Sequence, residues 1–155
     1  NSMRTFGLIK LIALGSFALS AGLALAGEFY EKDGVAIKGF DPVAYFKEGH
    51  AVKGSAEHTA VYKGSTFHFT SAANREAFAA NPGEYAPQYD GFCAYGVAKG
   101  AKAKIEGEAF KIVEGKLYLN YDAKVQGDWN KDVSTYVMQA DKNWADVAKL
   151  EKVVE

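Results

Sequence analysis

The chain has 155 residues, of which 48% are hydrophobic, 24% charged and 14% aromatic, and its formal net charge is −1. This length suits one domain with a real hydrophobic core, and the many aromatic residues argue against disorder. The near-zero charge removes the long-range electrostatic basis for binding nucleic acid, so nucleic acid is not an expected partner. The single cysteine excludes an intrachain disulfide framework and a zinc site of four thiolates.

Residues 1–26 have the pattern of a secretory signal peptide. Two residues that resemble the remnant of an expression tag precede Met3, and two basic residues are followed by the charge-free stretch Leu11–Ala26, which ends in Ala-Leu-Ala. We expect cleavage before Gly27 and a periplasmic or secreted bacterial domain over residues 27–155. As a helix of roughly 24 Å the stretch is short for a ~30 Å hydrocarbon core, so membrane contact is expected only if it stays attached.

The domain is predicted to begin with a turn, a short strand and a short helix. Lys32-Asp33-Gly34 is a turn signal ahead of the apolar run Val35–Ile37. Asp41 is a typical N-cap, and Pro42 is a typical first helical residue because its missing N–H would be unpaired there anyway. This pattern predicts a short helix that Gly49 terminates.

A hairpin and a helix follow. The runs 57–62 and 66–70 are rich in β-branched and aromatic residues and flank a Lys-Gly-Ser turn, which predicts a hairpin. Ser71 is the expected cap of a helix over Ala72–Ala80, which ends at Asn81-Pro82-Gly83.

The rest of the chain is predicted to contain a short helical segment, a second hairpin and two helices. Residues 91–97 suggest one or two helical turns, and residues 110–113 and 116–121 flank a two-residue Glu-Gly turn. Alternation in the second strand predicts one buried face and one semi-polar face. Beyond it, apolar residues recur at helical spacing; these are Trp129, Val133, Tyr136, Val137, Ala140, Trp144, Val147 and Ala148. We therefore predict a small single α+β domain with two hairpins, several short helices and a C-terminal helical segment.

Several ordered motifs resemble the YHS domain family. They are Asp41-Pro42-Val43, the hairpin from Tyr62 to Ser71, Phe78–Tyr85, Tyr89–Gly100 and Gly115–Tyr121. The longer pattern is similar to the exported, stand-alone members of the family. YHS domains occur beside copper-transporting ATPases and some multicomponent hydroxylases, and they are similar to the TRASH metal-binding modules. The resemblance thus implies a role connected with a transition metal such as copper.

This chain departs from the thiol-bearing members of that family. Their cysteines follow Asp-Pro-Val, end the hairpin and recur one helical turn later, and the matching positions here are Ala44, Thr70 and Asn74. Methyl, hydroxyl and amide groups bind soft metals feebly, whereas thiolates select Cu(I) and zinc. We expect the inherited metal site to be lost.

Cys93 is the first residue that could still carry chemistry. Tyr89, Phe92 and Tyr95 could form an aromatic pocket around its sulfur, with Asp41 as a further candidate near the site. At a helix start, the dipole would lower the pKa of the thiol and favour the thiolate. The alternative is a buried cysteine that acts as a small hydrophobic residue.

His68 is the preferred histidine for a metal site shared with Cys93. It lies between Phe67 and Phe69 on a predicted strand, which directs it to the opposite face from both rings, where it would simply face solvent or a neighbouring strand if it binds no metal. A His–Cys pair suits one type of copper site. Asp41 is expected to be a helix cap rather than a ligand, and no catalytic residue is assigned.

These observations predict an exported, non-catalytic accessory or binding protein in periplasmic copper handling, whose partner is a metal ion or a periplasmic protein. Two alternatives belong to other classes. One is a thiol-based redox protein in which Cys93 forms a mixed disulfide with a partner. The other is a metal-free interaction module with an apolar docking patch.

Overall fold

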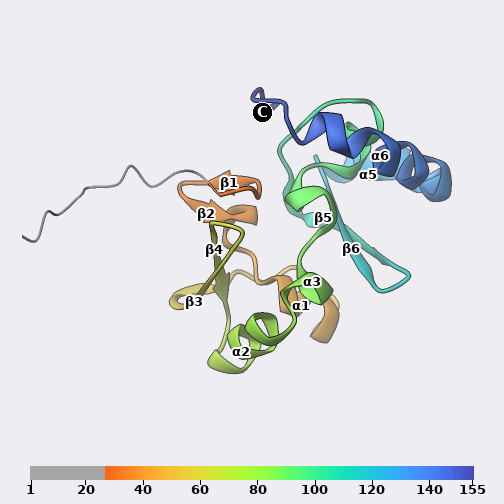
Figure 1. Ribbon diagram of the computed structural model, residues 1–155. Helices are drawn as coiled ribbons and strands as arrows, with labels where there is room; N and C mark the ends of the chain where they lie inside the picture. The colour runs from red at the N-terminus through yellow and green to blue at the C-terminus, as the bar shows by residue number, and fades with distance from the viewer. Residues whose placement is uncertain (1–26) are drawn as a thin grey trace, which may run out of the picture.

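The computed structural model describes residues 27–155, which form a small single α+β domain (Figure 1). The predicted signal peptide, its tag remnant and its membrane contact all fall on residues 1–26, which lie outside the described residues. Within the described part, no helix has both the length and the apolar character needed to cross a membrane.

Three antiparallel hairpins supply the strands. They are β1 (Glu31–Lys32) with β2 (Val35–Ala36), β3 (Ser55–Tyr62) with β4 (Ser65–Phe69), and β5 (Glu106–Val113) with β6 (Lys116–Asn120). Each hairpin turns through two residues with positive φ, the second of which is glycine. Such a turn has the twist that the flanking strands require. Both predicted hairpins are confirmed, and the first turn signal of the chain forms a third.

The helices of the N-terminal part are short and begin at side-chain caps or at proline. They are α1 (Pro42–Lys47), α2 (Ala72–Ala80) and α3 (Pro82–Tyr85), with a 3₁₀ turn, η1 (Ile37–Gly39), ahead of α1. As predicted, the Ser71 hydroxyl accepts the backbone N–H of Asn74 and caps α2. Phe78 of α2 packs on the second hairpin, with its ring centroid 4.8 Å from that of Phe67 and 5.1 Å from that of Phe69.

The C-terminal part joins two helices to the third hairpin. After a second 3₁₀ turn, η2 (Gln88–Gly91), come α4 (Ala94–Ala98), the hairpin, α5 (Ala123–Asn130) and α6 (Val133–Val147). The predicted pair of C-terminal helices is confirmed: α5 ends at Asn130, and α6 begins at Val133 with Asp132 as its N-cap. The apolar stripe of α6 packs against α4, which leaves Ala140 and Val147 buried.

The prediction that β6 has one semi-polar face is wrong. Residues 117–120 are all buried, because aromatic residues cover the face that was expected to meet solvent. The Tyr118 ring lies 5.5 Å from that of Trp129 and 6.0 Å from that of Tyr89. Alternation along one strand predicts which residues share a face, but a helix packed on the second face removes the difference in burial.

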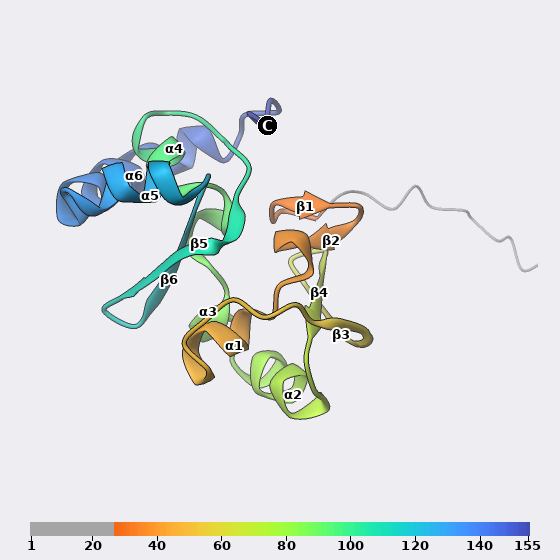
Figure 2. The same ribbon diagram turned by 180° about the vertical axis from the view of Figure 1, so that it is seen from behind.

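The two parts of the domain lie side by side. Figure 1 shows the first two hairpins, α1 and α2 on one side and the third hairpin with α5 and α6 on the other, and Figure 2 shows the same division from behind. The chain between α2 and α4 joins them. The Tyr45 hydroxyl donates to the carbonyl of Gly107 at 2.8 Å, and the N–H of Tyr30 donates to the carbonyl of Asp90 at 2.9 Å. Buried hydrogen bonds therefore hold the two parts together.

Candidate functional site

A buried carboxylate lies at the start of α1. Asp41 is 0% exposed, and its Oδ1 accepts the backbone N–H groups of Val43 at 2.8 Å and Ala44 at 3.2 Å. Its Oδ2 accepts the N–H of Thr70 at 2.9 Å, the Thr70 hydroxyl at 3.0 Å and Nδ2 of Asn74 at 2.8 Å. A carboxylate tolerates burial when hydrogen bonds replace its water, and here five donors do so. The predicted cap is confirmed.

The same bonds tie three separate elements together. Thr70 directly follows β4 and Asn74 lies in the first turn of α2, and Nδ2 of Asn74 also donates to Oγ1 of Thr70 at 3.1 Å. Asp41 belongs to the loop before α1, so its carboxylate joins α1, β4 and α2. We call Asp41, Thr70 and Asn74 the Asp41 network. The donor groups of Thr70 and Asn74 in this network point at the carboxylate of Asp41.

Cys93 is 1% exposed and caps α4 with its sulfur. Sγ accepts the backbone N–H of Gly96 at 3.4 Å and that of Tyr121 at 3.2 Å, and the thiol donates to Oδ1 of Asn120 at 3.6 Å. Burial raises the pKa of the thiol, although the backbone N–H bonds from Gly96, Tyr121 and Tyr95 act to lower it. The lowering expected from the helix start is therefore present, but loss of water around the sulfur outweighs it and the net shift is upward. The sulfur is a sealed, neutral thiol.

His68 faces away from Phe67 and Phe69, as predicted from the strand period, and both phenyl rings are fully buried. It lines an open cavity of about 430 Å³ that it shares with three lysines and one aspartate. The lysines are Lys32, Lys38 and Lys53. Their ammonium charges exceed the single carboxylate of the cavity and oppose a metal cation beside the imidazole.

Cys93 and His68 are joined by neither a hydrogen bond nor a common cavity. Residues 27–155 contain no group of three or more histidine, cysteine, aspartate or glutamate side chains placed to hold a metal ion. A metal site made from this pair therefore stays a prediction of the sequence, without a contact between its members.

One comparison with known proteins, against the models of protein families, returned a match. Residues 43–89 match the model of the YHS domain. The chain contains a YHS domain. The match confirms the resemblance seen in the sequence, while export and a stand-alone role stay predictions. The comparisons with curated proteins and with solved structures returned no match.

Two members of the Asp41 network, Thr70 and Asn74, are at positions where the sequence resemblance leads us to expect cysteines in thiol-bearing members of the family. The fold places Thr70 and Asn74 within hydrogen-bond distance of each other and puts Ala44 next to the same carboxylate. Positions separated by up to thirty residues in the sequence thus lie around one carboxylate. Here they present a methyl group, a hydroxyl and an amide, which bind soft metals feebly.

The aromatic residues predicted to surround Cys93 each pack against a different aromatic or polar partner. Phe92 lies 5.8 Å from the ring of Tyr30, and Tyr95 lies 5.1 Å from that of Tyr136. The Tyr89 hydroxyl donates to Oδ1 of Asp141 on α6 at 2.8 Å. Tyr89 therefore belongs to a different site, at the edge of the YHS domain.

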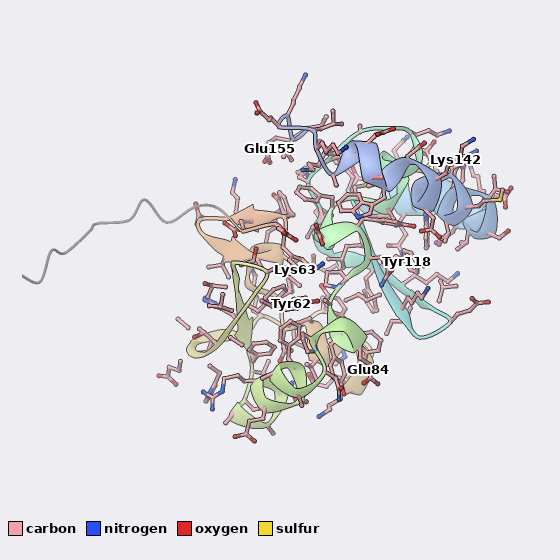
Figure 3. All side chains as sticks on the ribbon, viewed as in Figure 1. Tyr62, Lys63, Glu84, Tyr118, Lys142 and Glu155 are labelled. Carbon is pink, nitrogen blue, oxygen red and sulfur yellow. The ribbon has the colours of Figure 1, made fainter. Side chains whose placement is uncertain are left out.

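That site is an open cavity of about 300 Å³ between the two parts of the domain. Seven of its lining residues carry aromatic or charged groups: Phe29, Tyr62, Lys63, Tyr89, Asp90, Asp141 and Trp144. Figure 3 shows Tyr62 and Lys63 on the side of the second hairpin, facing the region between the two parts. Sequence reasoning missed the cavity because its residues come from distant segments, and α6 lies outside the matched YHS segment. The helical spacing of Trp144 indicated core packing alone, and Asp141 gave no signal.

Proposed function

We propose that the protein is an exported, non-catalytic accessory protein of transition-metal handling, with copper as the metal. In this proposal it acts on a periplasmic protein partner and does not hold the ion in its YHS core. The YHS domain supports the connection with metals. The Asp41 network supports the accessory role, because it fills two of the three thiol positions, 70 and 74, with a closed set of hydrogen bonds.

The network is a poor copper or zinc site for three reasons. All three donors to Oδ2 of Asp41 are N–H or O–H groups, so a cation at this oxygen would have to displace them. The remaining side chain, Ala44, is a buried methyl group that offers no electron pair. Oxygen ligands without a thiolate also suit hard cations better than copper or zinc.

The thiol-based redox alternative has less support than the accessory role. A mixed disulfide requires a thiolate that a partner can reach. Cys93 is buried, burial raises its pKa, and its sulfur already accepts two backbone N–H groups. These features suit a protected thiol in an oxidising compartment, which is where the sequence of residues 1–26 would direct the chain.

A copper titration of the purified chain tests the proposal. The chain and its Cys93→Ser variant should both take up far less than one equivalent of Cu(I) in competition with a chromogenic chelator. A triple variant with Ala44→Cys, Thr70→Cys and Asn74→Cys should bind about one equivalent, because it restores three thiolates at converging positions. Circular dichroism shows that each variant is folded.

One result would replace the proposal with the interpretation in which Cys93 binds the metal. If the unaltered chain bound one copper ion and Cys93→Ser abolished the binding, Cys93 would be a ligand and the protein a carrier. The export part is tested separately by cell fractionation and N-terminal sequencing, which should recover a periplasmic protein that starts at Gly27. Loss of copper tolerance in a strain that lacks the protein, with no change in zinc tolerance, would support the choice of metal.

A further inference from the structure

The cavity between the two parts of the domain combines aromatic side chains with acidic groups. Phe29 and Tyr62 come from its hairpin side, with ring centroids 5.9 Å apart. Tyr89 and Trp144 come from its other side, with centroids 5.8 Å apart. Its volume of about 300 Å³ is at the lower end of the range for small-molecule sites. Both parts of the domain are needed to form the cavity, since neither part contains all four rings.

Two carboxylates and one ammonium group give the cavity a net negative charge. Asp90 and Asp141 both line it, and Lys63 is the only basic residue that does so among the described residues. Asp90 is half-buried, and burial raises its pKa even though Lys63 acts to lower it. The carboxylate is therefore incompletely compensated and would gain from a further cation.

The backbone that carries Tyr89 and Asp90 is held in an uncommon conformation. Tyr89 has φ of 57°, Asp90 has 51° and Gly91 has 77°, so three successive residues are left-handed. This conformation is unfavourable for any residue with a side chain. Gly91 cannot be replaced without a shift, because a Cβ there would lie 2.7 Å from a methyl group of Ile37. The Tyr89–Asp141 hydrogen bond fixes the turn against α6, which keeps both side chains at the cavity.

The protein's own Lys63 shows that this environment accepts an ammonium group. Its Nζ lies 3.8 Å from Oδ1 of Asp90 and 5.6 Å from the ring centroid of Tyr62. A cation close to a carboxylate and an aromatic ring is attracted by both the charge and the ring quadrupole. Asp141 and Trp144 offer the same pair of groups on the other side, and there no lysine of the cavity wall is paired with the carboxylate.

We propose that this cavity binds a small organic ammonium ion, with Asp141 and Trp144 as its principal contacts. The aromatic rings would face its alkyl groups, and the carboxylates would balance its charge. A metal ion fits less well, because the two carboxylates are joined by no third ligand among residues 27–155. This inference does not depend on the proposed role in metal handling.

Titration with tetramethylammonium chloride, at constant ionic strength and followed by NMR, tests the proposal. The indole N–H signal of Trp144 should shift and saturate, while that of Trp129, which is 0% exposed, serves as an internal reference. Asp141→Asn should weaken binding by about fivefold or more, because the neutral amide keeps the shape but removes the charge. Lys63→Gln should strengthen it, since the competing ammonium is removed.

Two controls separate the site from general effects. Asp146→Asn removes the same charge from an exposed position of α6 outside the cavity and should leave binding unchanged. tert-Butanol, which has a similar shape without the charge, should produce no saturable shift. The proposal is overturned if tert-butanol or sodium acetate binds as well as tetramethylammonium, if Asp146→Asn weakens binding as much as Asp141→Asn, or if the Trp144 signal does not move.

Discussion

Asp41 and Cys93 are both buried N-caps, yet their surroundings differ. The carboxylate of Asp41 receives five donors from three elements. Around Cys93, the sulfur accepts two N–H groups, and Nδ2 of the neighbouring Asn120 is buried with no partner among the described residues. The hydrogen bonds around the Asp41 carboxylate are thus complete, whereas the surroundings of Cys93 include one buried amide group that lacks an acceptor among the described residues.

The two sites should therefore differ in how much stability is lost when the capping side chain is removed. A charged acceptor that satisfies five buried donors cannot be removed without leaving several of them unpaired, and each unpaired group is unfavourable. A neutral sulfur makes longer and weaker bonds, so fewer strong interactions depend on it. We therefore expect the N-terminal part of the domain to depend more on one side chain than the C-terminal part does.

The largest effect is expected for Asp41→Ala. The change leaves the Thr70 and Asn74 donors unpaired and removes the cap of α1, so the free energy of unfolding should fall by about 3–5 kcal/mol. Urea denaturation followed by circular dichroism measures it.

Asp122→Ala is the matched control for that variant. Asp122 also caps a helix, but among residues 27–155 its carboxylate accepts only the N–H of Val125, at 2.8 Å. Its loss should therefore lower stability by about 1 kcal/mol. If the two aspartates gave equal losses, the extra bonds of the Asp41 network would contribute nothing.

An intermediate effect is expected for Cys93→Ala. Two backbone N–H groups and Oδ1 of Asn120 lose a partner, and we expect the free energy of unfolding to fall by about 1–2 kcal/mol. Cys93→Ser keeps a donor and an acceptor at nearly the same place and should lose less. A serine variant that is less stable than the alanine variant would show that packing of the sulfur matters more than its hydrogen bonds.

Thr70→Val should have a smaller effect, because it deletes one hydroxyl from the Asp41 network and keeps the side-chain shape. Oδ2 of Asp41 retains the Thr70 N–H and Nδ2 of Asn74, so a loss of about 1 kcal/mol is expected. Thr66→Val, on the strand β4 that precedes Thr70, provides the reference for the change in side-chain type. Equal losses of stability at both positions would mean that the bonds of the Thr70 hydroxyl within the Asp41 network do not stabilise the protein.

The smallest signal is expected for alkylation of the Cys93 thiol at neutral pH. Because burial raises its pKa, Cys93 should be neutral in the folded state, and native alkylation by iodoacetamide should be negligible at pH 7. The unfolded thiol ionises near pH 8.5, so the stability that the neutral thiol provides is present below this pH and is lost as the pH rises above it. Unfolding at pH 7 and pH 9.5 should show this loss in the unaltered chain but not in Cys93→Ala. A native thiol that reacts at the rate of a free one would contradict the prediction.

Local sequence signals predicted most elements of the fold. Asp41, Ser71 and the Lys63-Gly64 turn act on their immediate neighbours, so their effects can be derived from a few adjacent residues. The burial of Tyr118 could not be derived in this way. It depends on Trp129 and Tyr89, which only the folded chain brings against the outer face of β6.

The candidate site divides in the same manner. The family resemblance singled out positions 44, 70 and 74, but only the structure shows their groups joined through the carboxylate of Asp41. The nature of Cys93 was open in the sequence, because a helix start and burial shift its pKa in opposite directions. Its surroundings decide the direction, and burial raises the pKa.

The sequence by itself determined the caps, the hairpin turns, the YHS pattern and the absence of thiols at positions 44, 70 and 74, since each is a property of residue type and short spacing. Only the tertiary structure decided that the Asp41 network is closed, that Cys93 is sealed and that Tyr89, Asp141 and Trp144 line one cavity. The physical reason is that burial and the pairing of distant polar groups depend on contacts between segments, which no local pattern encodes.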